Sequence, residues 1–404
     1  MSTDTLAAQR RAAAGQLWLC MFLLWLAGNG LRLTILAPPP VISLVHADLN
    51  MTETEVGLLS GIPALLFAFA AVPGALLVAR FGARNTLLFG LIATAVGSAL
   101  RGASPNVATL FLATGVTGFG VAVMQPTMPA LVRAWLPKHV SVATAVYTNG
   151  LLIGEVLPVA LTLPLVMPLV GSWRIDFAVW GAACVVIAVI VAALAPGAQA
   201  PVPGAQPAAP RRWWPDWHNS LLWRLGIMMG CVNATYFATN FFVPRYLHVT
   251  GRDEFTSAAL IALNVGQLPA SALLLFFGRG LEVRNWPYVA AGLVCLASVA
   301  AIVFGNGPMV VAGAGMVGFS AAAVLILMLA LPPILSEPDD VARSAAGMMA
   351  ISYTCAVVAP ILCGFAWDAS GLPAMAFLPL AVCCVVLFFA SLTARIRPFS
   401  EVGR

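Results

Sequence analysis

The chain has 404 residues, of which 61% are hydrophobic and only 9% are charged, and its mean hydropathy is +0.95. Because a soluble protein cannot bury that much apolar surface, this composition excludes soluble enzymes and soluble binding proteins and predicts a polytopic membrane protein. The net charge of +5 does not predict nucleic-acid binding, since the basic residues lie in short, separate segments.

Twelve apolar stretches follow one another along the chain, separated by Gly, Pro and charged residues. A helix needs about 20 apolar residues to cross a hydrocarbon core of about 30 Å, and continuous apolar runs of this length favour helices over strands. The sequence therefore predicts an all-α polytopic fold with spans at residues 17–45, 55–79, 86–104, 107–135, 140–169, 174–196, 219–247, 255–277, 286–304, 308–334, 341–366 and 371–394.

A stretch rich in Ala, Pro and Gly separates the sixth predicted span from the seventh, and this composition predicts a linker. We therefore expect an N-terminal six-helix bundle at residues 1–196, a cytoplasmic linker at residues 197–217 and a C-terminal six-helix bundle at residues 218–404. The two halves also share short motifs, such as Gly118-Phe119 in one and Gly318-Phe319 in the other. Pseudo-symmetric halves predict a substrate site near the midplane between them.

The loop charges predict the orientation in the membrane. Of the 20 Lys and Arg residues, fifteen fall in segments that are cytoplasmic if the N-terminus is inside, and four fall in the opposite loops. An excess of Lys and Arg marks the cytoplasmic side of a membrane protein. We expect a multi-pass protein of the cell inner membrane with both termini in the cytoplasm.

Arg32 lies inside the first apolar stretch, near the middle of a span. An arginine at that depth costs at least about 2.5–3.5 kcal/mol on insertion scales, and such residues usually line a pathway or pair with another helix. The alternatives are a structural ion pair with a neighbouring helix, or a functional role in recognising an anionic substrate or in gating. Asn29, one turn earlier, is expected to line the same surface.

Glu155 is the one carboxylate deep inside an apolar span. Glu155 and Arg32 each lie fifteen residues from the start of their spans, so the two charges are expected at similar depth. The sequence leaves three roles open for Glu155: a salt bridge to Arg32, a proton-coupling site, or a structural contact between helices. Gly150 and Gly154 have the four-residue spacing that lets helices approach closely.

Polar side chains form a stripe on the seventh predicted span. Asn233, Tyr236 and Asn240 have the spacing i, i+3 and i+7, which places them on one face of a helix. Such groups need partners or water inside a membrane, so we favour a cavity-lining stripe, with hydrogen bonding between helices as the alternative. Further candidate substrate-binding residues lie inside other spans: Gln125, Asn264, Gln267 and Tyr353.

The sequence contains no phosphate-binding loop, no His/Glu metal cluster and no Ser/His/Asp arrangement. The eight cysteines fall inside apolar runs and show no metal-ligand spacing. We therefore expect a protein that is not an enzyme, with no catalytic residues, no metal and no cofactor.

The twelve spans, the central linker and the two similar halves resemble the major facilitator superfamily. Residues 80–84 (RFGAR) are similar to the signature loop of this superfamily between spans two and three, although Ala79 stands where an acidic residue is usual. The resemblance implies a major facilitator fold that works by alternating access, with a gating loop that contains Arg80, Gly82 and Arg84.

Within the superfamily, several stretches resemble the branch of cyanate permeases and 2-nitroimidazole transporters. These are residues 29–34 (NGLRLT) with the prolines that follow, residues 118–129, and the polar stripe of the seventh span. Members of that branch are associated with small anions or compact polar molecules. The resemblance implies that Arg32 recognises the substrate, with support from Asn29, Gln125 and Tyr236.

These observations lead to one hypothesis and two alternatives. The hypothesis is a monomeric secondary active transporter of a small anion or compact polar organic solute, such as a cyanate-, nitro- or carboxylate-like compound, with protons coupled through Glu155. A proton-coupled drug or metabolite exporter is the alternative within the superfamily, for which more acidic cavity residues are expected. A membrane sensor or receptor is an alternative of another class, and would normally carry a soluble signalling domain.

Overall fold

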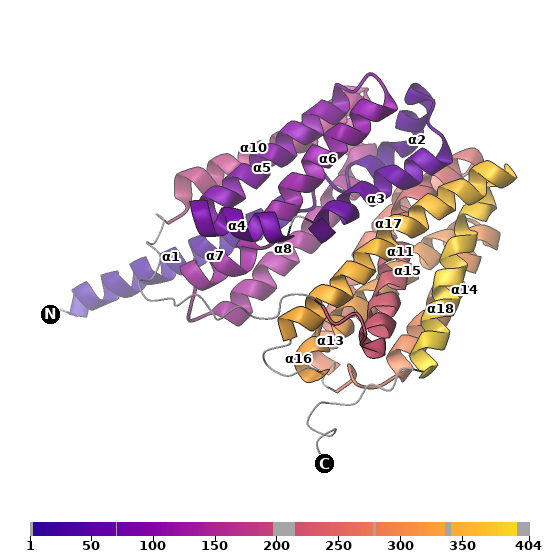
Figure 1. Cartoon of the computed structure of the whole chain (residues 1–404). Helices are drawn as coiled ribbons and strands as arrows, with labels where there is room; N and C mark the ends of the chain where they lie inside the picture. Colours follow the sequence, from indigo (N-terminus) through magenta and orange to yellow (C-terminus); the bar gives the residue numbers. More distant parts are fainter. Residues whose placement is uncertain (1–2, 70, 197–214, 278–279, 336–340, 394–404) are drawn as a thin grey trace, which may run out of the picture. The chain divides into compact units, whose positions relative to one another are not determined.

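The computed structural model describes residues 3–69, 71–196, 215–277, 280–335 and 341–393, and every regular element in these residues is a helix (Figure 1). The α-helices are α1 (Thr3–Gly30), α2 (Pro38–Leu49), α3 (Glu53–Phe69), α4 (Ala71–Phe81), α5 (Ala83–Gly102), α6 (Val107–Met124), α7 (Thr127–Trp135), α8 (Val140–Leu161), α9 (Met167–Val170), α10 (Trp173–Leu194), α11 (Ser220–Val249), α12 (Thr256–Val265), α13 (Gln267–Phe277), α14 (Trp286–Phe304), α15 (Gly307–Leu329), α16 (Pro332–Leu335), α17 (Val341–Ser370) and α18 (Leu378–Thr393). One π-helix, η1 (Thr162–Val166), and two 3-10 helices, η2 (Asp253–Phe255) and η3 (Pro373–Phe377), complete the set.

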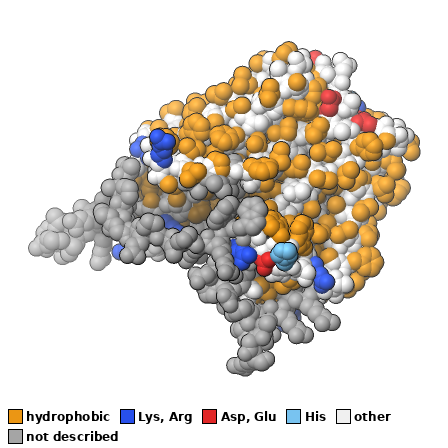
Figure 2. All heavy atoms as spheres, in the orientation of Figure 1, with side chains coloured by type: hydrophobic (Ala, Val, Ile, Leu, Met, Phe, Trp, Pro, Cys, Tyr) orange, Lys and Arg blue, Asp and Glu red, His pale blue; other side chains and the backbone are white. Residues whose placement is uncertain are grey.

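Large apolar side chains cover much of the described surface (Figure 2). Leu112, Leu169 and Phe304 are 72%, 77% and 85% exposed, an arrangement that suits lipid and not water. Nine stretches of the described chain are long and apolar enough to cross a membrane. The prediction of an all-α polytopic membrane protein is confirmed, and the number of twelve spans stays a prediction.

The chain divides into two compact units. Unit 1 comprises Met1–Ala37 and Phe69–Ala205, and unit 2 comprises Pro38–Ala68 and Gln206–Arg404. Helix α2 and nearly all of α3 therefore pack with helices from the second half of the sequence. The predicted division into residues 1–196 and 218–404 stays a prediction, because most of the linker expected at residues 197–217 lies outside the described residues.

The first predicted span is two helices and not one. Helix α1 ends at Gly30, residues 31–37 form turns and bends, and α2 begins at Pro38 with three consecutive prolines. Proline fits the first turn of a helix, where its missing N–H is not needed, but it cannot continue a helix that precedes it. Arg101, which is 1% exposed, donates from Nη1 to the Thr34 carbonyl oxygen at 2.8 Å. This bond gives a partner to a backbone carbonyl in the non-helical segment between α1 and α2.

In unit 1, helices α1 and α8 are in backbone contact. A Cβ atom added at Gly28 would clash with the Tyr147 carbonyl oxygen, and one at Gly150 would clash with that of Trp25. A Cβ at Gly154 would lie 2.5 Å from the Asn29 carbonyl oxygen. The close approach predicted from the spacing of Gly150 and Gly154 is therefore confirmed, and the contact fixes the position of the end of α1 on α8.

We expect Gly154→Ala to lower the thermal unfolding temperature of the purified protein, because the added methyl group must push α1 away from α8. Overpacking of this kind costs about 1–3 kcal/mol. Gly115→Ala is the matched control, since a Cβ at Gly115 in α6 meets nothing within 4 Å. Equal melting temperatures for the two variants would contradict the backbone contact.

Candidate functional site

Arg32 and Glu155 form an ion pair in unit 1. Arg32 lies in the break after α1 and Glu155 lies on α8, and Arg32 Nε is 3.3 Å from Glu155 Oε1. The two side chains are 16% and 5% exposed, so water screens the pair only weakly. The structure thus brings together the two intramembrane charges that the sequence placed at similar depth.

Asn29 supports the same region from the last turn of α1. Its amide Nδ2 donates to the Trp25 carbonyl oxygen at 2.9 Å, and the residue is 2% exposed. The Trp25 indole donates in turn to Asn149 Oδ1 on α8 at 3.0 Å. The Trp25–Asn149 bond adds a polar contact to the glycine contact between α1 and α8, whereas the Asn29 bond stays within α1.

Gln125, also in unit 1, lies at a second helix break. Helix α6 ends at Met124 and α7 begins at Thr127, so Gln125 and Pro126 separate them. Pro126 has no N–H with which to continue the helical hydrogen bonds, and this explains the break. Gln125 is half-buried there.

In unit 2, four of the predicted polar residues form one hydrogen-bond network. Tyr236 donates from its hydroxyl to Asn264 Oδ1 at 2.7 Å, and Gln267 Nε2 donates to the Tyr236 hydroxyl at 3.1 Å. Asn264 Nδ2 donates to Asn240 Oδ1 at 3.0 Å, and Asn240 Nδ2 donates to the Tyr236 carbonyl oxygen at 3.0 Å. All four side chains are buried, so α11, α12 and α13 are joined by amide and hydroxyl groups inside an apolar unit.

A helix break lies beside this network too. Helix α12 ends at Val265 and α13 begins at Gln267. A Cβ at Gly266 would clash with the Gly315 carbonyl oxygen, so the break packs directly on the backbone of α15. The break gives the Gln267 side chain its position next to the Tyr236 hydroxyl.

Asn233 and Tyr353 make other contacts within unit 2. Asn233 Nδ2 donates to Ser352 Oγ on α17 at 2.7 Å. The Tyr353 ring meets the Phe67 ring edge-on, with 5.8 Å between the ring centroids. The polar stripe on α11 therefore makes hydrogen bonds in two directions, to α17 on one side and to α12 and α13 on the other.

The predicted gating loop joins α4 to α5. Gly82 has φ = 79°, a left-handed conformation that glycine adopts without steric cost. Arg84 donates from Nη2 to the Ala192 carbonyl oxygen of α10 at 2.6 Å, and the Arg80 guanidinium lies 5.5 Å from the centroid of the Phe81 ring. Arg84 thus ties the start of α5 to the end of α10 within unit 1.

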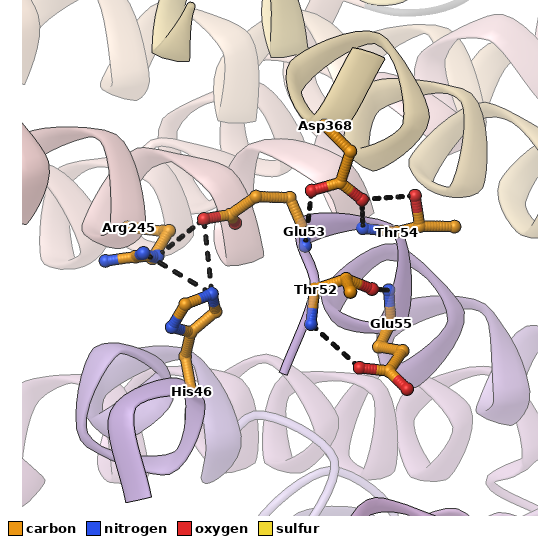
Figure 3. A network of polar contacts seen from close by, with 7 residues as sticks. All are labelled: His46, Thr52, Glu53, Thr54, Glu55, Arg245 and Asp368. Carbon is orange, nitrogen blue, oxygen red and sulfur yellow. Dashed lines mark hydrogen bonds and ion pairs between the residues drawn. The ribbon is translucent and has the colours of Figure 1, made fainter. Parts of the chain in front are cut away.

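The structure also shows a charged cluster in unit 2 that sequence analysis missed (Figure 3). Glu53 Oε1 lies 2.9 Å from Arg245 Nε and 3.3 Å from His46 Nε2. The Asp368 carboxylate accepts from the backbone N–H of Glu53 at 3.0 Å and of Thr54 at 2.8 Å. Glu53 and Asp368 are 315 positions apart, so no local pattern could have indicated the contact.

Among the described residues, no group of three or more His, Cys, Asp or Glu side chains could hold a metal ion. A cavity of about 470 Å³ lies between the middle of α1 and the junction of α7 and α8, where Cys20, Trp135, Lys138 and His139 are part of its lining. None of the predicted substrate-binding residues lines this cavity.

Comparison with known proteins identifies a family. Residues 17–360, which are most of the chain, match the family described as Major Facilitator Superfamily. Solved transporter structures share the fold. A bacterial homolog of the human lysosomal transporter Spinster has a TM-score of 0.74 at 15% identity, over 93% of this chain and 96% of its own. For a D-xylose-proton symporter the TM-score is 0.73 at 14% identity, over 95% of this chain and 99% of the symporter chain. The predicted major facilitator fold is confirmed.

Three curated relatives are similar over most of their length. The uncharacterized transporter YycB of Bacillus subtilis (strain 168) is 25% identical over 87% of this chain and 87% of its own. The 2-nitroimidazole transporter of Escherichia coli (strain K12) is 24% identical over 84% of this chain and 86% of its own. The cyanate transport protein CynX of the same organism is 22% identical over 92% of this chain and 96% of its own. The resemblance to this branch is confirmed.

We expect Asn264→Leu to lower the thermal unfolding temperature, because it removes the acceptor of the Tyr236 hydroxyl and the donor to the Asn240 amide oxygen. A buried polar group that loses its partner costs about 1–3 kcal/mol in soluble proteins, and a membrane hydrogen bond about 0.6 kcal/mol on average. Thr354→Val is the control, since among the described residues this exposed hydroxyl donates to the Ala350 carbonyl oxygen of its own helix. A similar loss of stability in both variants would argue against the network.

Proposed function

The chain belongs to the major facilitator superfamily and is a membrane transporter, not an enzyme, and we propose that it moves a small anion or compact polar organic solute by alternating access. The observation that carries this proposal is the Arg32–Glu155 pair beside the break in the first span. Non-helical backbone and buried charges inside a membrane are costly, and transporters place both where they handle a substrate.

Arg32 supplies the chemistry for anion recognition. Its guanidinium is planar and offers several N–H donors in a fixed fork, which matches carboxylate-like and nitro-like oxygen pairs. The relatives support a compact solute, because two of them are described as transporters of 2-nitroimidazole and cyanate. We assign Arg32 the role of binding the substrate charge, with Asn29 and Gln125 as polar supports in unit 1.

Glu155 gives a physical route to proton coupling. With both side chains ionised, Arg32 and Glu155 together carry no net charge, and an added anion would leave one uncompensated negative charge in a weakly screened place. Protonation of Glu155 removes that excess, so proton binding and anion binding favour each other. By linkage this coupling is reciprocal, which is the requirement for symport.

The unit 2 network supplies neutral hydrogen-bonding groups. Tyr236, Asn240, Asn264 and Gln267 carry hydroxyl and amide groups but no formal charge. Such groups orient a polar solute without fixing the sign of its charge. We include Asn233 and Tyr353 in this substrate-contacting set, and we assign Arg80, Gly82 and Arg84 to a gating loop.

The loop charges support an orientation with both termini in the cytoplasm, in the inner membrane where a cell has two. The junction between α2 and α3 then faces outside, and the junction between α4 and α5 faces the cytoplasm. We propose that the protein works in this orientation as a monomer.

Arg32→Lys should reduce uptake of cyanate, nitrate and 2-nitroimidazole into proteoliposomes by about tenfold or more, because the charge stays but the planar fork of donors is lost. Arg133→Lys on α7 is the matched control, since Arg133 is exposed and outside the proposed site. The double variant Arg32→Gln/Glu155→Gln leaves no charge unpaired and separates loss of binding from loss of folding. Uptake near that of the unmodified protein in Arg32→Lys and in the double variant would remove the anion-site proposal.

Glu155→Gln should abolish the response of uptake to an imposed pH gradient, because glutamine keeps the shape of the carboxyl group but exchanges no proton. For the unmodified protein we expect faster uptake when the outside is more acidic. The measurement is initial uptake at several external pH values with a fixed internal pH. If the variant responds to the gradient as the unmodified protein does, Glu155 is a structural partner of Arg32 and not a coupling residue.

A further inference from the structure

Arg101 is a buried charge that the proposed mechanism does not use. It lies one residue before the end of α5 and is 1% exposed, and among the described residues no carboxylate pairs with it. Its Nε and Nη2 donors have no hydrogen-bond partner in the described part of the chain. Because an unpaired buried charge is strongly destabilising, stability does not explain an arginine at this position. We therefore looked for a contact that an apolar side chain could not make.

That contact is the hydrogen bond from Arg101 Nη1 to the Thr34 carbonyl oxygen, at 2.8 Å. Thr34 lies two residues after Arg32, in the non-helical segment between α1 and α2. The Arg32 carbonyl oxygen accepts from the N–H groups of Ile35 at 3.0 Å and Leu36 at 3.1 Å. Thr34 thus lies inside a turn that Arg32 closes, so a bond that holds the Thr34 carbonyl also fixes the backbone of Arg32.

The Arg101 guanidinium is itself held in place by α5 and α10. It lies 5.8 Å from the centroid of the Phe177 ring of α10, and Ser98 Oγ of α5 donates to the Phe177 carbonyl oxygen at 2.7 Å. A Cβ at Gly102 would clash with the Arg174 carbonyl oxygen, so the two helices also touch through their backbones. This close packing gives Arg101 a fixed base from which to hold the non-helical segment.

Helices α5 and α10 also support the end of α1, directly before the non-helical segment. A Cβ at Gly30 would lie 2.5 Å from Leu91 Cδ2 of α5 and 3.8 Å from Ile187 Cδ1 of α10. Glu155, the partner of Arg32, lies on α8 instead. The ion pair therefore joins α8 to a segment whose backbone is held by α5 and α10, all within unit 1.

We propose that Arg101 is a positioning residue for substrate binding: by holding the Thr34 carbonyl it directs the Arg32 side chain toward Glu155 and the bound anion. Arg101 does not contact the substrate in this role. The inference rests on the proposed function for its effect on transport, but the position of Arg32 relative to Glu155 can be measured without substrate. The role needs one N–H donor and not a planar fork, so lysine should replace Arg101 although it cannot replace Arg32.

The first test measures the interaction between Arg32 and Glu155 by a double-mutant cycle on the thermal unfolding temperature of the purified protein. Arg32→Gln and Glu155→Gln each leave one buried charge unpaired, whereas the double variant leaves none, so the shifts should be far from additive. In a chain that also carries Arg101→Met, the non-additive part should fall to about half or less, because Arg32 is no longer held against Glu155. Methionine removes both the charge and the donor.

Arg174→Met is the matched control, since Arg174 donates from Nη1 to the carbonyl oxygens of Gly102 and Ser104 at the same end of α5. It removes the same charge and should leave the cycle unchanged, and Arg101→Lys should retain most of the coupling. Full non-additivity in the Arg101→Met chain, or an equal loss with Arg174→Met, overturns the positioning role. Phe177→Leu, which removes the ring beside the guanidinium, is the substitute if the methionine variant does not fold.

The second test measures uptake kinetics in proteoliposomes. Arg101→Met should raise KM for cyanate and nitrate by about fivefold or more, with a smaller change in the maximal rate, because a misdirected Arg32 binds the anion less well. Arg101→Lys and Arg174→Met should keep KM near that of the unmodified protein, whereas Arg32→Lys should not.

The two tests separate this inference from the proposed function. An unchanged KM in Arg101→Met, or an equal rise in Arg101→Lys, overturns the assignment of Arg101 as a positioning residue for the substrate. Absence of cyanate and nitrate uptake by the unmodified protein counts against the proposed substrates. In that case the unfolding cycle still decides whether Arg101 holds Arg32 against Glu155.

Discussion

The backbone of a membrane-spanning chain must satisfy its own hydrogen bonds, and this constraint organises the structure. Helices meet it without help, so each interruption needs a specific replacement. Residues 31–37 receive a donor from the buried Arg101, and Gly266 rests on the backbone of α15. Three interruptions lie beside a polar residue singled out from the sequence: Arg32 in the first, Gln125 between α6 and α7, and Gln267 after Gly266. Non-helical backbone and polar side chains, both of which cost free energy inside a membrane, occur together, as expected where a transporter handles its solute.

The sequence was sufficient to predict which residues meet wherever helical periodicity and depth in the membrane decide the contact. Counting residues from the start of each span placed Arg32 and Glu155 at one level, and the structure brings them to 3.3 Å. The spacing of Gly150 and Gly154 indicated a backbone contact, which α1 supplies. These predictions succeeded because a straight helix converts sequence position directly into height and direction, and Arg32 lies only two residues beyond the end of α1.

The sequence was not sufficient where partners come from distant segments. The first apolar stretch reads as one continuous span, and only packing shows that it breaks after Gly30. Asn233 and Tyr236 share a face of α11, yet Asn233 bonds to Ser352 on α17 while Tyr236 bonds to Asn264 on α12. The contacts of Glu53 with Arg245 and Asp368 join segments 192 and 315 positions apart, and no local pattern indicates them.

The glycine contact between α1 and α8 has a consequence for ligand chemistry. Because backbone atoms touch at Gly28, Gly150 and Gly154, the spacing of the two helices does not depend on side-chain rotamers that adjust to each bound molecule. The segments that carry Arg32 and Glu155 are therefore held at a set spacing by backbone contacts. An inhibitor directed at them gains affinity from matching a set charge separation, and flexible molecules that rely on the protein adapting to them would gain little.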